Sequence, residues 1–276
     1  MTKIPCLSLN DKTSIPQFGL GTWQVPNEQV PVAVAAAWES GYRAIDTAAI
    51  YQNETGVGEG LRRLAIPRDK IYITTKLWNA DQGYDSTLKA MDTSLAKLGL
   101  DYVDLYLIHW PLPKRNRYLD TWKALIKLKE SGKAKSIGVS NFTIPHLQRV
   151  INETGITPSV NQIELHPQLA QKEMRAFHAQ HGIVTESWSP LAQGNLLTNE
   201  TIVGIARKHN KTAAQVILRW HIENGLVVIP KSVNPARIKE NIAIFDFQLT
   251  PEDMSAIDQL DTGKRFGSHP DVFDMV

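Results

Sequence analysis

Four side chains able to take part in proton transfer follow one another in the first half of the chain. Asp46, Lys76 and His109 each end a separate run of β-branched and aromatic residues, and Tyr51 lies just beyond Asp46. Each alone has a simpler explanation, as a helix cap, a solvated charge or a packed core residue. Three different ionisable groups at equivalent positions of consecutive strands favour one shared site.

The chemistry that this group suggests is proton donation to a carbonyl oxygen. A phenol has an ordinary pKa of about 10, so Tyr51 needs a nearby cation to become a useful acid, and Lys76 can supply it. Asp46 would pair with Lys76 and offset the cost of burying its charge. With a pKa expected near working pH, His109 would orient the carbonyl or relay the proton. Since none of these groups supplies a hydride, a nicotinamide cofactor is expected.

The second half of the chain offers groups suited to such a cofactor. Amide and hydroxyl groups end two further strands and could meet a carboxamide, a tryptophan ends the next, and a short loop could approach a pyrophosphate. Two cations near the last strand suit a 2′-phosphate, although an ordinary solvated face would have the same spacing. These residues are Ser140, Asn141 and Gln162; Trp188; the loop 189–194; and Lys231, Ser232 and Arg237.

The elements that must position these residues alternate between short strands and longer helices. We predict strands at 18–21, 42–46, 71–76, 103–109, 135–141, 159–165, 183–189 and 226–231. Several intervening segments, such as 86–98 and 121–130, have helical apolar spacing and end at glycine. Eight such units predict an α/β fold, a single (β/α)₈ TIM barrel over residues 1–276, whose active site lies at the carboxyl ends of the strands.

Further segments surround the predicted barrel. Residues 6–9 and 13–16 are expected to form an N-terminal β-hairpin, and 235–241 and 251–260 extra C-terminal helices. A two-domain Rossmann fold is the alternative, but no strand is followed by G-x-G-x-x-G. The cluster Gly56, Gly58 and Gly60 falls where a helix begins, so it carries little weight for nucleotide binding.

Composition limits the other classes of function. A net charge of +2 among 276 residues argues against a nucleic-acid partner. No apolar run resembles a signal peptide or a membrane span, and the single cysteine, Cys6, excludes an internal disulfide and a cysteine metal cluster. We therefore expect no membrane partner, no metal site and a cytoplasmic location.

Six motifs in order resemble those of the aldo-keto reductase family over nearly the whole chain. They are GYRAIDTA (41–48) with Tyr51, TKLW (75–78), LIHWP (107–111), IGVSNF (137–142), NQIELHP (161–167) and IPKSV (229–233). Within the family the chain is most similar to bacterial 2,5-diketo-D-gluconate reductases, a similarity that extends to LRWH (218–221) and FDF (245–247).

The resemblance implies a monomeric barrel that binds NADPH without a Rossmann fold and reduces small aldehydes and ketones. It assigns proton donation to Tyr51, supported by Asp46, Lys76 and His109. Ser140, Asn141, Gln162 and Trp188 would hold the nicotinamide, and Ser189, Leu191, Gln193 and Gly194 the pyrophosphate. The adenosine 2′-phosphate end would contact Lys231, Ser232, Val233, Arg237, Glu240 and Asn241.

The substrate pocket is expected to be lined by Trp23, Trp78 and Trp110 beside Tyr51 and His109. The loop 189–199 and the tail after Asp261 are short, which predicts an open pocket. Diketogluconate, methylglyoxal, other 2-oxoaldehydes and β-keto esters all remain candidate substrates. Two alternatives stay open: a Schiff-base enzyme with Lys76 as nucleophile, and an NADPH-binding regulatory subunit.

Overall fold

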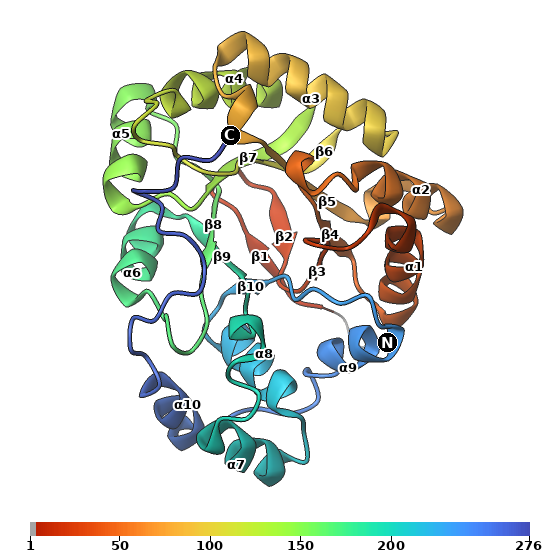
Figure 1. Ribbon diagram of the computed structural model, residues 1–276, viewed down its shortest axis with the longest axis vertical. Helices are drawn as coiled ribbons and strands as arrows, with labels where there is room; N and C mark the ends of the chain where they lie inside the picture. The colour runs from red at the N-terminus through yellow and green to blue at the C-terminus, as the bar shows by residue number, and fades with distance from the viewer. Residues whose placement is uncertain (1–3) are drawn as a thin grey trace.

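Eight parallel strands form the centre of the computed structural model, which describes residues 4–276, and helices surround them (Figure 1). Each strand pairs with its neighbours in chain order, as right-handed strand–helix–strand units require. The strands are β3 (Leu20–Gly21), β4 (Ala44–Asp46), β5 (Tyr72–Leu77), β6 (Val103–Ile108), β7 (Ala134–Ser140), β8 (Val160–Glu164), β9 (Val184–Trp188) and β10 (Val227–Val228). The predicted (β/α)₈ barrel is confirmed.

The barrel closes where its first and last strands meet. Phe18 pairs with Val228 and Gly21 with Lys231 through isolated parallel bridges, and the Gly19 amide donates to the Val228 carbonyl over 2.9 Å. Because this seam consists of single bridges, β3 and β10 are much shorter than the predicted strands 18–21 and 226–231.

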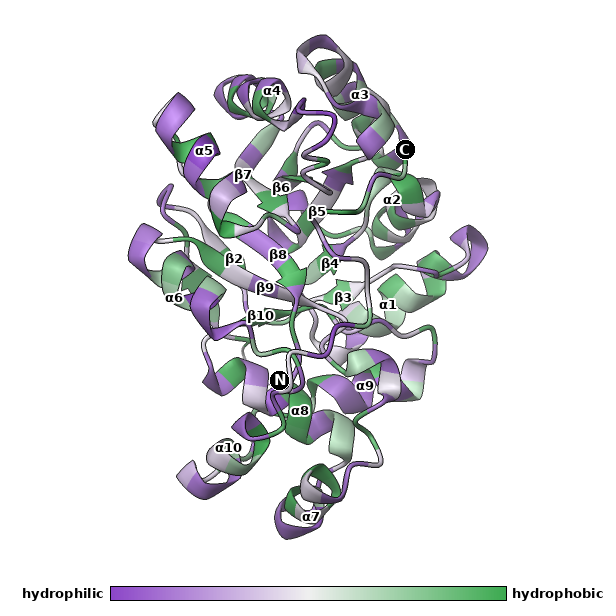
Figure 2. Cartoon of the chain, turned by 60° about the vertical axis from the view of Figure 1, so that its left-hand side comes forward, coloured by the Kyte–Doolittle hydropathy of each residue, from purple (hydrophilic) through white to green (hydrophobic). Residues whose placement is uncertain are grey.

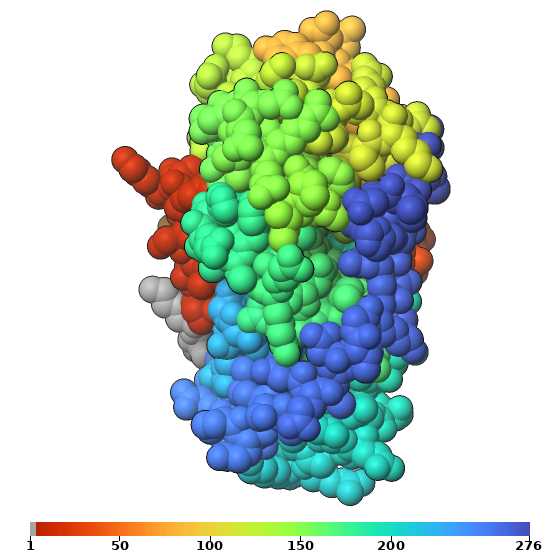
Figure 3. Space-filling view, turned by 90° about the vertical axis from the view of Figure 1, so that its left-hand side faces the viewer, coloured from red at the N-terminus to blue at the C-terminus, as the bar shows by residue number. Residues whose placement is uncertain are grey.

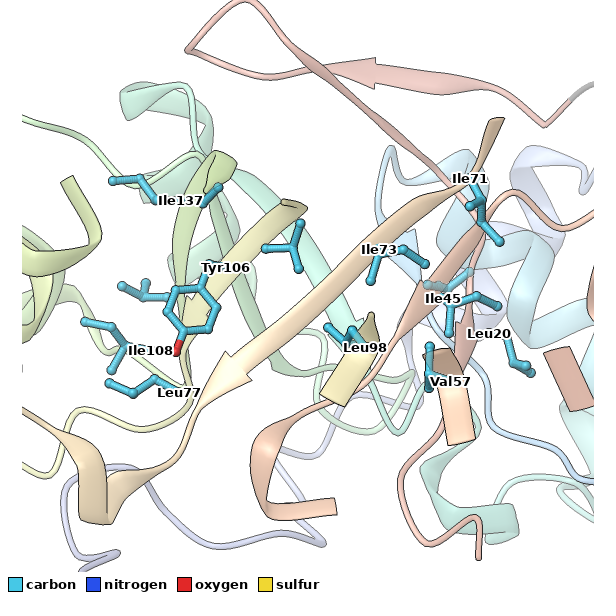
Figure 4. Close-up of a cluster of buried hydrophobic side chains, with 14 of the residues drawn as sticks. Leu20, Ile45, Val57, Ile71, Ile73, Leu77, Leu98, Tyr106, Ile108 and Ile137 are labelled. Carbon is cyan, nitrogen blue, oxygen red and sulfur yellow. The ribbon is translucent and has the colours of Figure 1, made fainter. Parts of the chain in front are cut away.

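The helices lie around the strands with their apolar sides inward (Figure 2). Figure 4 shows Ile73 and Leu77 of β5 and Tyr106 and Ile108 of β6 among the buried side chains of this layer. Four helices are followed directly by glycines at positive φ, including Gly41 (102°) and Gly99 (66°), of which Gly99 ends the predicted helix 86–98. The helices are α1 (Val30–Ser40), α2 (Glu54–Leu64), α3 (Tyr84–Leu98), α4 (Tyr118–Glu130), α5 (Ile144–Thr154), α6 (Lys172–His181), α7 (Glu200–His209), α8 (Ala213–Glu223), α9 (Pro235–Ile242) and α10 (Pro251–Asp258).

The glycine cluster of α2 serves close packing. A Cβ on Gly56 would lie 2.3 Å from the Asn27 carbonyl oxygen, and one on Gly58 would lie 2.3 Å from that of Leu98. A Cβ on Gly60 would meet Val34 of α1 at 2.9 Å. These glycines let α2 approach α1 and α3, which agrees with the low weight given to them as a nucleotide motif.

The two ends of the barrel are covered by different parts of the chain. The hairpin of β1 (Cys6–Ser8) and β2 (Ser14–Pro16) closes one end, where Leu9 and Ile15 pack against Leu105 of β6. In Figure 3 this red hairpin and the dark blue C-terminal tail lie on opposite sides of the molecule. Within residues 4–276, no helix combines the length and apolar character needed to cross a membrane.

Candidate active site

A buried ion pair lies where β4 and β5 end. The Nζ atom of Lys76 donates to Oδ1 of Asp46 over 2.5 Å and to the Thr47 carbonyl over 2.9 Å. Lys76 is fully buried and Asp46 nearly so. Burial is the largest single effect and opposes the charge of Lys76, but Asp46, Tyr51 and Glu186 together outweigh it, and the pKa of Lys76 rises above its ordinary value. The site thus contains a permanent cation.

Tyr51 lies directly beside this cation. It ends the short 3₁₀ helix η2 (Ala49–Tyr51), and Lys76 Nζ is 5.1 Å from the centre of its ring. Burial raises the pKa of Tyr51 above the ordinary value of a phenol, and Lys76 opposes that rise. The expected effect of Lys76 on Tyr51 is present, but burial is the larger effect, so the phenol keeps its proton at neutral pH.

His109 follows β6 and faces Tyr51 edge-on. The two ring centres are 5.7 Å apart, and Trp78 packs against the other side of the imidazole at 5.4 Å. Burial, together with the charge of Lys76, holds the pKa of His109 well below its usual value. The expectation of a pKa near working pH was therefore wrong, because it ignored desolvation. A neutral imidazole can orient a carbonyl but is a poor proton relay.

Glu186 is a buried carboxyl that sequence reasoning missed. It lies on β9 and is 2% exposed. The Nε2 atom of Gln162 donates both to Glu186 Oε2 and to Asp46 Oδ2, each over 2.9 Å. The alternation along β9 could have revealed it, because Glu186 stands two residues before Trp188 and so shares its inward face.

A cavity of about 580 Å³ opens above these groups at the carboxyl ends of the strands. Asp46, Tyr51 and His109 reach it, whereas Lys76 lies behind them. All three predicted tryptophans line it: Trp23, Trp78 and Trp110. The predicted cofactor residues that line it are Ser140, Asn141, Gln162, Trp188, Ser189, Gln193 and Lys231.

Polar groups for a nicotinamide carboxamide converge on one wall of this cavity. Trp188 Nε1 donates to Asn141 Oδ1 over 2.8 Å, and Asn141 Nδ2 donates to the His109 carbonyl over 3.0 Å. Asn141 and Ser189 have positive φ values of 62° and 49°, so the chain turns sharply directly after β7 and beside β9. Such backbone positions are costly and concentrate at functional sites.

Only some of the residues predicted to bind the phosphates line the cavity. Lys231 lines the cavity and is exposed. Arg237 lies in the first turn of α9, where Asn234 caps the helix by accepting from its backbone amide. The remaining predicted residues lie outside the cavity lining: Leu191, Gly194, Ser232, Val233, Arg237, Glu240 and Asn241. Of these, Glu240 accepts a hydrogen bond from Thr212 over 2.9 Å.

These groups fit NADPH. Trp188 gives the cavity an aromatic face and Lys231 gives it a cation. Gln162 also lines the cavity, and its amide oxygen has no hydrogen-bond partner among residues 4–276.

The C-terminal tail forms a roof that the sequence did not predict. Phe266, Gly267, Ser268, Phe273 and Met275 all line the cavity. The short tail therefore still reaches the pocket that we expected to be open.

Several contacts hold this roof, among them an ion pair between Arg115 and Asp274 at 2.7 Å. The buried carboxylate of Glu164 accepts from the backbone amides of Phe266 and Gly267 over 2.6 and 3.0 Å. Phe273 lies against Trp110, with ring centres 4.2 Å apart, and the Met275 carbonyl accepts from Asn79 over 2.7 Å. Gly267 also passes the edge of Trp188 so closely that a Cβ there would lie 2.3 Å from Cη2. In Figure 1 the dark blue tail runs from α10 towards the top of the view.

The part of the chain that the structure describes contains no candidate metal-binding site. There, no three His, Cys, Asp or Glu side chains are grouped as metal ligands would be.

Comparison with known proteins identifies the family. Residues 16–262 match the Aldo/keto reductase family. The chain is 56% identical to "Methylglyoxal reductase DkgA" of Yersinia pestis, over 99% of both chains. Among solved structures, an aldo/keto reductase from Brucella melitensis has 59% identity and a TM-score of 0.91, covering 94% of this chain and all of that one. A variant of Gox0644 in complex with NADPH has 49% identity and a TM-score of 0.96, covering 99% and 100%.

These matches confirm the predicted family and the prediction of an NADPH-dependent oxidoreductase, since a structural neighbour of this family holds that cofactor. The chain belongs to the aldo/keto reductase family.

Proposed function

We propose that this chain reduces small aldehydes and ketones to alcohols, with NADPH as cofactor and Tyr51 as proton donor. The observation that carries the proposal is the position of the Tyr51 phenol, which lies close to the buried Lys76–Asp46 pair and edge-on to the neutral imidazole of His109 in the lining of one cavity.

Each of these side chains has a separate part in the proposal. Tyr51 Oη, which keeps its proton at neutral pH, gives it to the carbonyl oxygen of the substrate. Lys76 stabilises the phenolate that remains, and Asp46 holds the ammonium group in place. His109, whose Nδ1 has no partner among residues 4–276, turns its other nitrogen towards the cavity and orients the carbonyl.

When bound, NADPH supplies the hydride. Ser140, Asn141 and Gln162 would hold its carboxamide and Trp188 would cover the ring. The loop 189–194, with Ser189, Leu191, Gln193 and Gly194, would face the pyrophosphate. The 2′-phosphate end would meet Lys231, Ser232, Val233, Arg237, Glu240 and Asn241, where Lys231 and Arg237 carry the positive charge.

Small 2-oxo carbonyl compounds are the substrates that we propose, with methylglyoxal first and 2,5-diketo-D-gluconate, reduced to 2-keto-L-gulonate, second. The aromatic walls, formed by Trp23, Trp78, Trp110 and Phe273, favour compact substrates gripped by shape. Relatives named for methylglyoxal reduction support this order. A panel of carbonyl compounds compared by kcat/KM tests it.

The Schiff-base alternative is disfavoured by the position of Lys76. Its amine is fully buried, bonded to Asp46 and Thr47, and separated from the cavity. Borohydride trapping of substrate on Lys76 without nucleotide would revive that alternative.

We also propose a cytoplasmic monomer: the single cysteine, Cys6, agrees with a reducing compartment, and the family resemblance supports the monomer. Gel filtration coupled to light scattering tests the oligomeric state.

The deciding experiment replaces Tyr51 by phenylalanine. Tyr51→Phe removes the proton but keeps the ring, so kcat should fall by about 10² to 10⁴-fold while NADPH still binds. Turnover is followed by NADPH absorbance and binding by tryptophan fluorescence. Tyr84→Phe, which changes an exposed tyrosine on α3, is the matched control and should behave as the wild type. Retained turnover in Tyr51→Phe would refute the assignment.

A further inference from the structure

A second buried carboxyl lies within the barrel, one layer below the Asp46–Lys76 pair. Glu186 faces inward from β9, where its strand neighbour is Gln162 of β8. Together with Asp46, Tyr72 and Thr74 it lines a small internal cavity of about 10 Å³. The aldo-keto reductase resemblance assigned no role to this residue.

The Gln162 amide joins the two carboxyl groups. Its Nε2 carries two hydrogens, and both are used: one by Asp46 Oδ2 and one by Glu186 Oε2, each over 2.9 Å. The amide oxygen is thereby turned away from both carboxyl groups, and Gln162 itself lines the large cavity. Glu186 thus acts on the side chain that faces the predicted carboxamide site.

The surroundings of Glu186 contain one cation for two carboxyl groups. Its titratable neighbours are Asp46 from β4, Lys76 and Tyr72 from β5, and Tyr51 from η2. The rest of the small cavity is lined by Ile15, Pro16, Gly19, Ala44, Ile45, Thr74, Val227 and Ile229, which carry no charge. Lys76 is already paired with Asp46, so an ionised Glu186 would be left without a cation of its own.

This arrangement makes the charge of Glu186 depend on pH. Burial and the negative charge of Asp46 raise the pKa of Glu186 to about 8. The group therefore holds its proton to a higher pH than an ordinary carboxyl does and ionises as the solution becomes alkaline. Ionised Glu186 raises the pKa of Tyr51, because a negative charge nearby favours the protonated phenol.

We propose that Glu186 is a positioning residue of this site, whose carboxyl holds the Gln162 amide beside Asp46 and places a second ionisable group near Tyr51. In alkaline solution its negative charge would help to keep the proton on Tyr51. This inference rests on the proposed function of Tyr51 as proton donor.

The test compares pH profiles of kcat for carbonyl reduction in the wild type, Glu186→Gln and Glu186→Asp. Glutamine still accepts the Gln162 hydrogen bond but never ionises. Its alkaline limb should lie lower by about one pH unit, so its kcat relative to that of the wild type should fall as the pH is raised and should approach a tenfold loss above the pKa of Tyr51, which exceeds the ordinary phenol value of about 10. Glu186→Asp keeps an ionisable group and should move the limb back towards wild type.

Ser187→Ala is the matched control, because Ser187 is the next residue on β9, faces away and has no hydrogen-bond partner among residues 4–276. Its profile should match that of the wild type. Superimposed profiles for wild type and Glu186→Gln would overturn the inference.

A measurement on the wild type covers the case in which Glu186→Gln does not fold. Infrared spectra should show a protonated carboxyl band at pH 7 that is lost by pH 9, and its absence at pH 7 would also overturn the inference. Failure of the proposed function is recognised separately, since an active Tyr51→Phe refutes that function whatever Glu186 does.

Discussion

The floor and the roof of the cavity are built in different ways. The floor is formed by Asp46, Lys76 and His109, which are buried and come from the ends of neighbouring strands, and by the half-buried Tyr51 of η2 beside them. The roof, residues 266–275, has no regular secondary structure and is held through a few contacts, chiefly at Glu164, Asn79 and Trp110.

The floor thus carries the proposed catalytic side chains, whereas the roof shapes the substrate pocket. Backbone hydrogen bonds between β4, β5 and β6 fix the floor, so its geometry depends on the whole barrel. The roof can change residue by residue without disturbing the strands. We therefore expect substitutions in the floor to lower kcat and stability, and substitutions at the rim and roof to change KM.

The largest effect should follow from breaking the floor. Lys76→Met leaves Asp46 buried without its cation, so kcat should fall about 10³-fold and the free energy of unfolding by about 3–5 kcal/mol. Steady-state kinetics and chemical denaturation measure both. Adding Asp46→Asn should restore part of the stability but no activity. A kcat near that of the wild type in Lys76→Met would contradict the expectation that substitutions in the floor lower kcat.

An intermediate effect is expected at the rim, where Lys231 stands beside the barrel seam. Lys231→Ala should raise KM for NADPH about tenfold to a hundredfold, since a charge-assisted contact to phosphate is lost, and leave KM for NADH unchanged. Lys239→Ala, an exposed lysine on α9 outside the cavity, is the control. Equal losses for both cofactors would refute a role in 2′-phosphate recognition.

The smallest effect is expected in the roof. Phe273→Ala removes the ring that lies against Trp110, so KM for small carbonyl substrates should rise about three- to tenfold, with kcat within about twofold. Val272→Ala changes the exposed neighbour and should have no effect. A fall in kcat as large as that of Lys76→Met would show that the roof takes part in the chemistry.

The floor could be predicted from the sequence because its positions follow from strand endings. Asp46, Lys76 and His109 end or follow inward-facing strand positions, and barrel topology brings such positions together. Trp23, Trp78 and Trp110 were predicted for the same reason. Element types were recovered better than boundaries: β10 covers only Val227–Val228 of the predicted 226–231, because the seam pairs through single bridges.

Other features depend on contacts between distant parts of the chain. Phe266 reaches the cavity where Glu164, about a hundred residues earlier, accepts hydrogen bonds from two backbone amides of the tail, and Phe273 reaches it through its contact with Trp110. No local sequence pattern predicts this contact between Glu164 and the tail. Glu186 was overlooked because a carboxyl inside a barrel contradicts the apolar pattern expected there, and the low pKa of His109 required knowledge of its burial.

The seam between β3 and β10 also bears on the order in which the molecule assembles. Its neighbourhood joins residues far apart in sequence; the Gln17 side chain, for example, donates to the Ile222 carbonyl across 205 positions. Closing so long a loop costs entropy that only the completed barrel repays, so the seam should be among the last parts to form during folding. Because Lys231 bridges Gly21 at that seam, recovery of NADPH binding should lag behind recovery of helical circular dichroism when the unfolded chain is returned to native conditions.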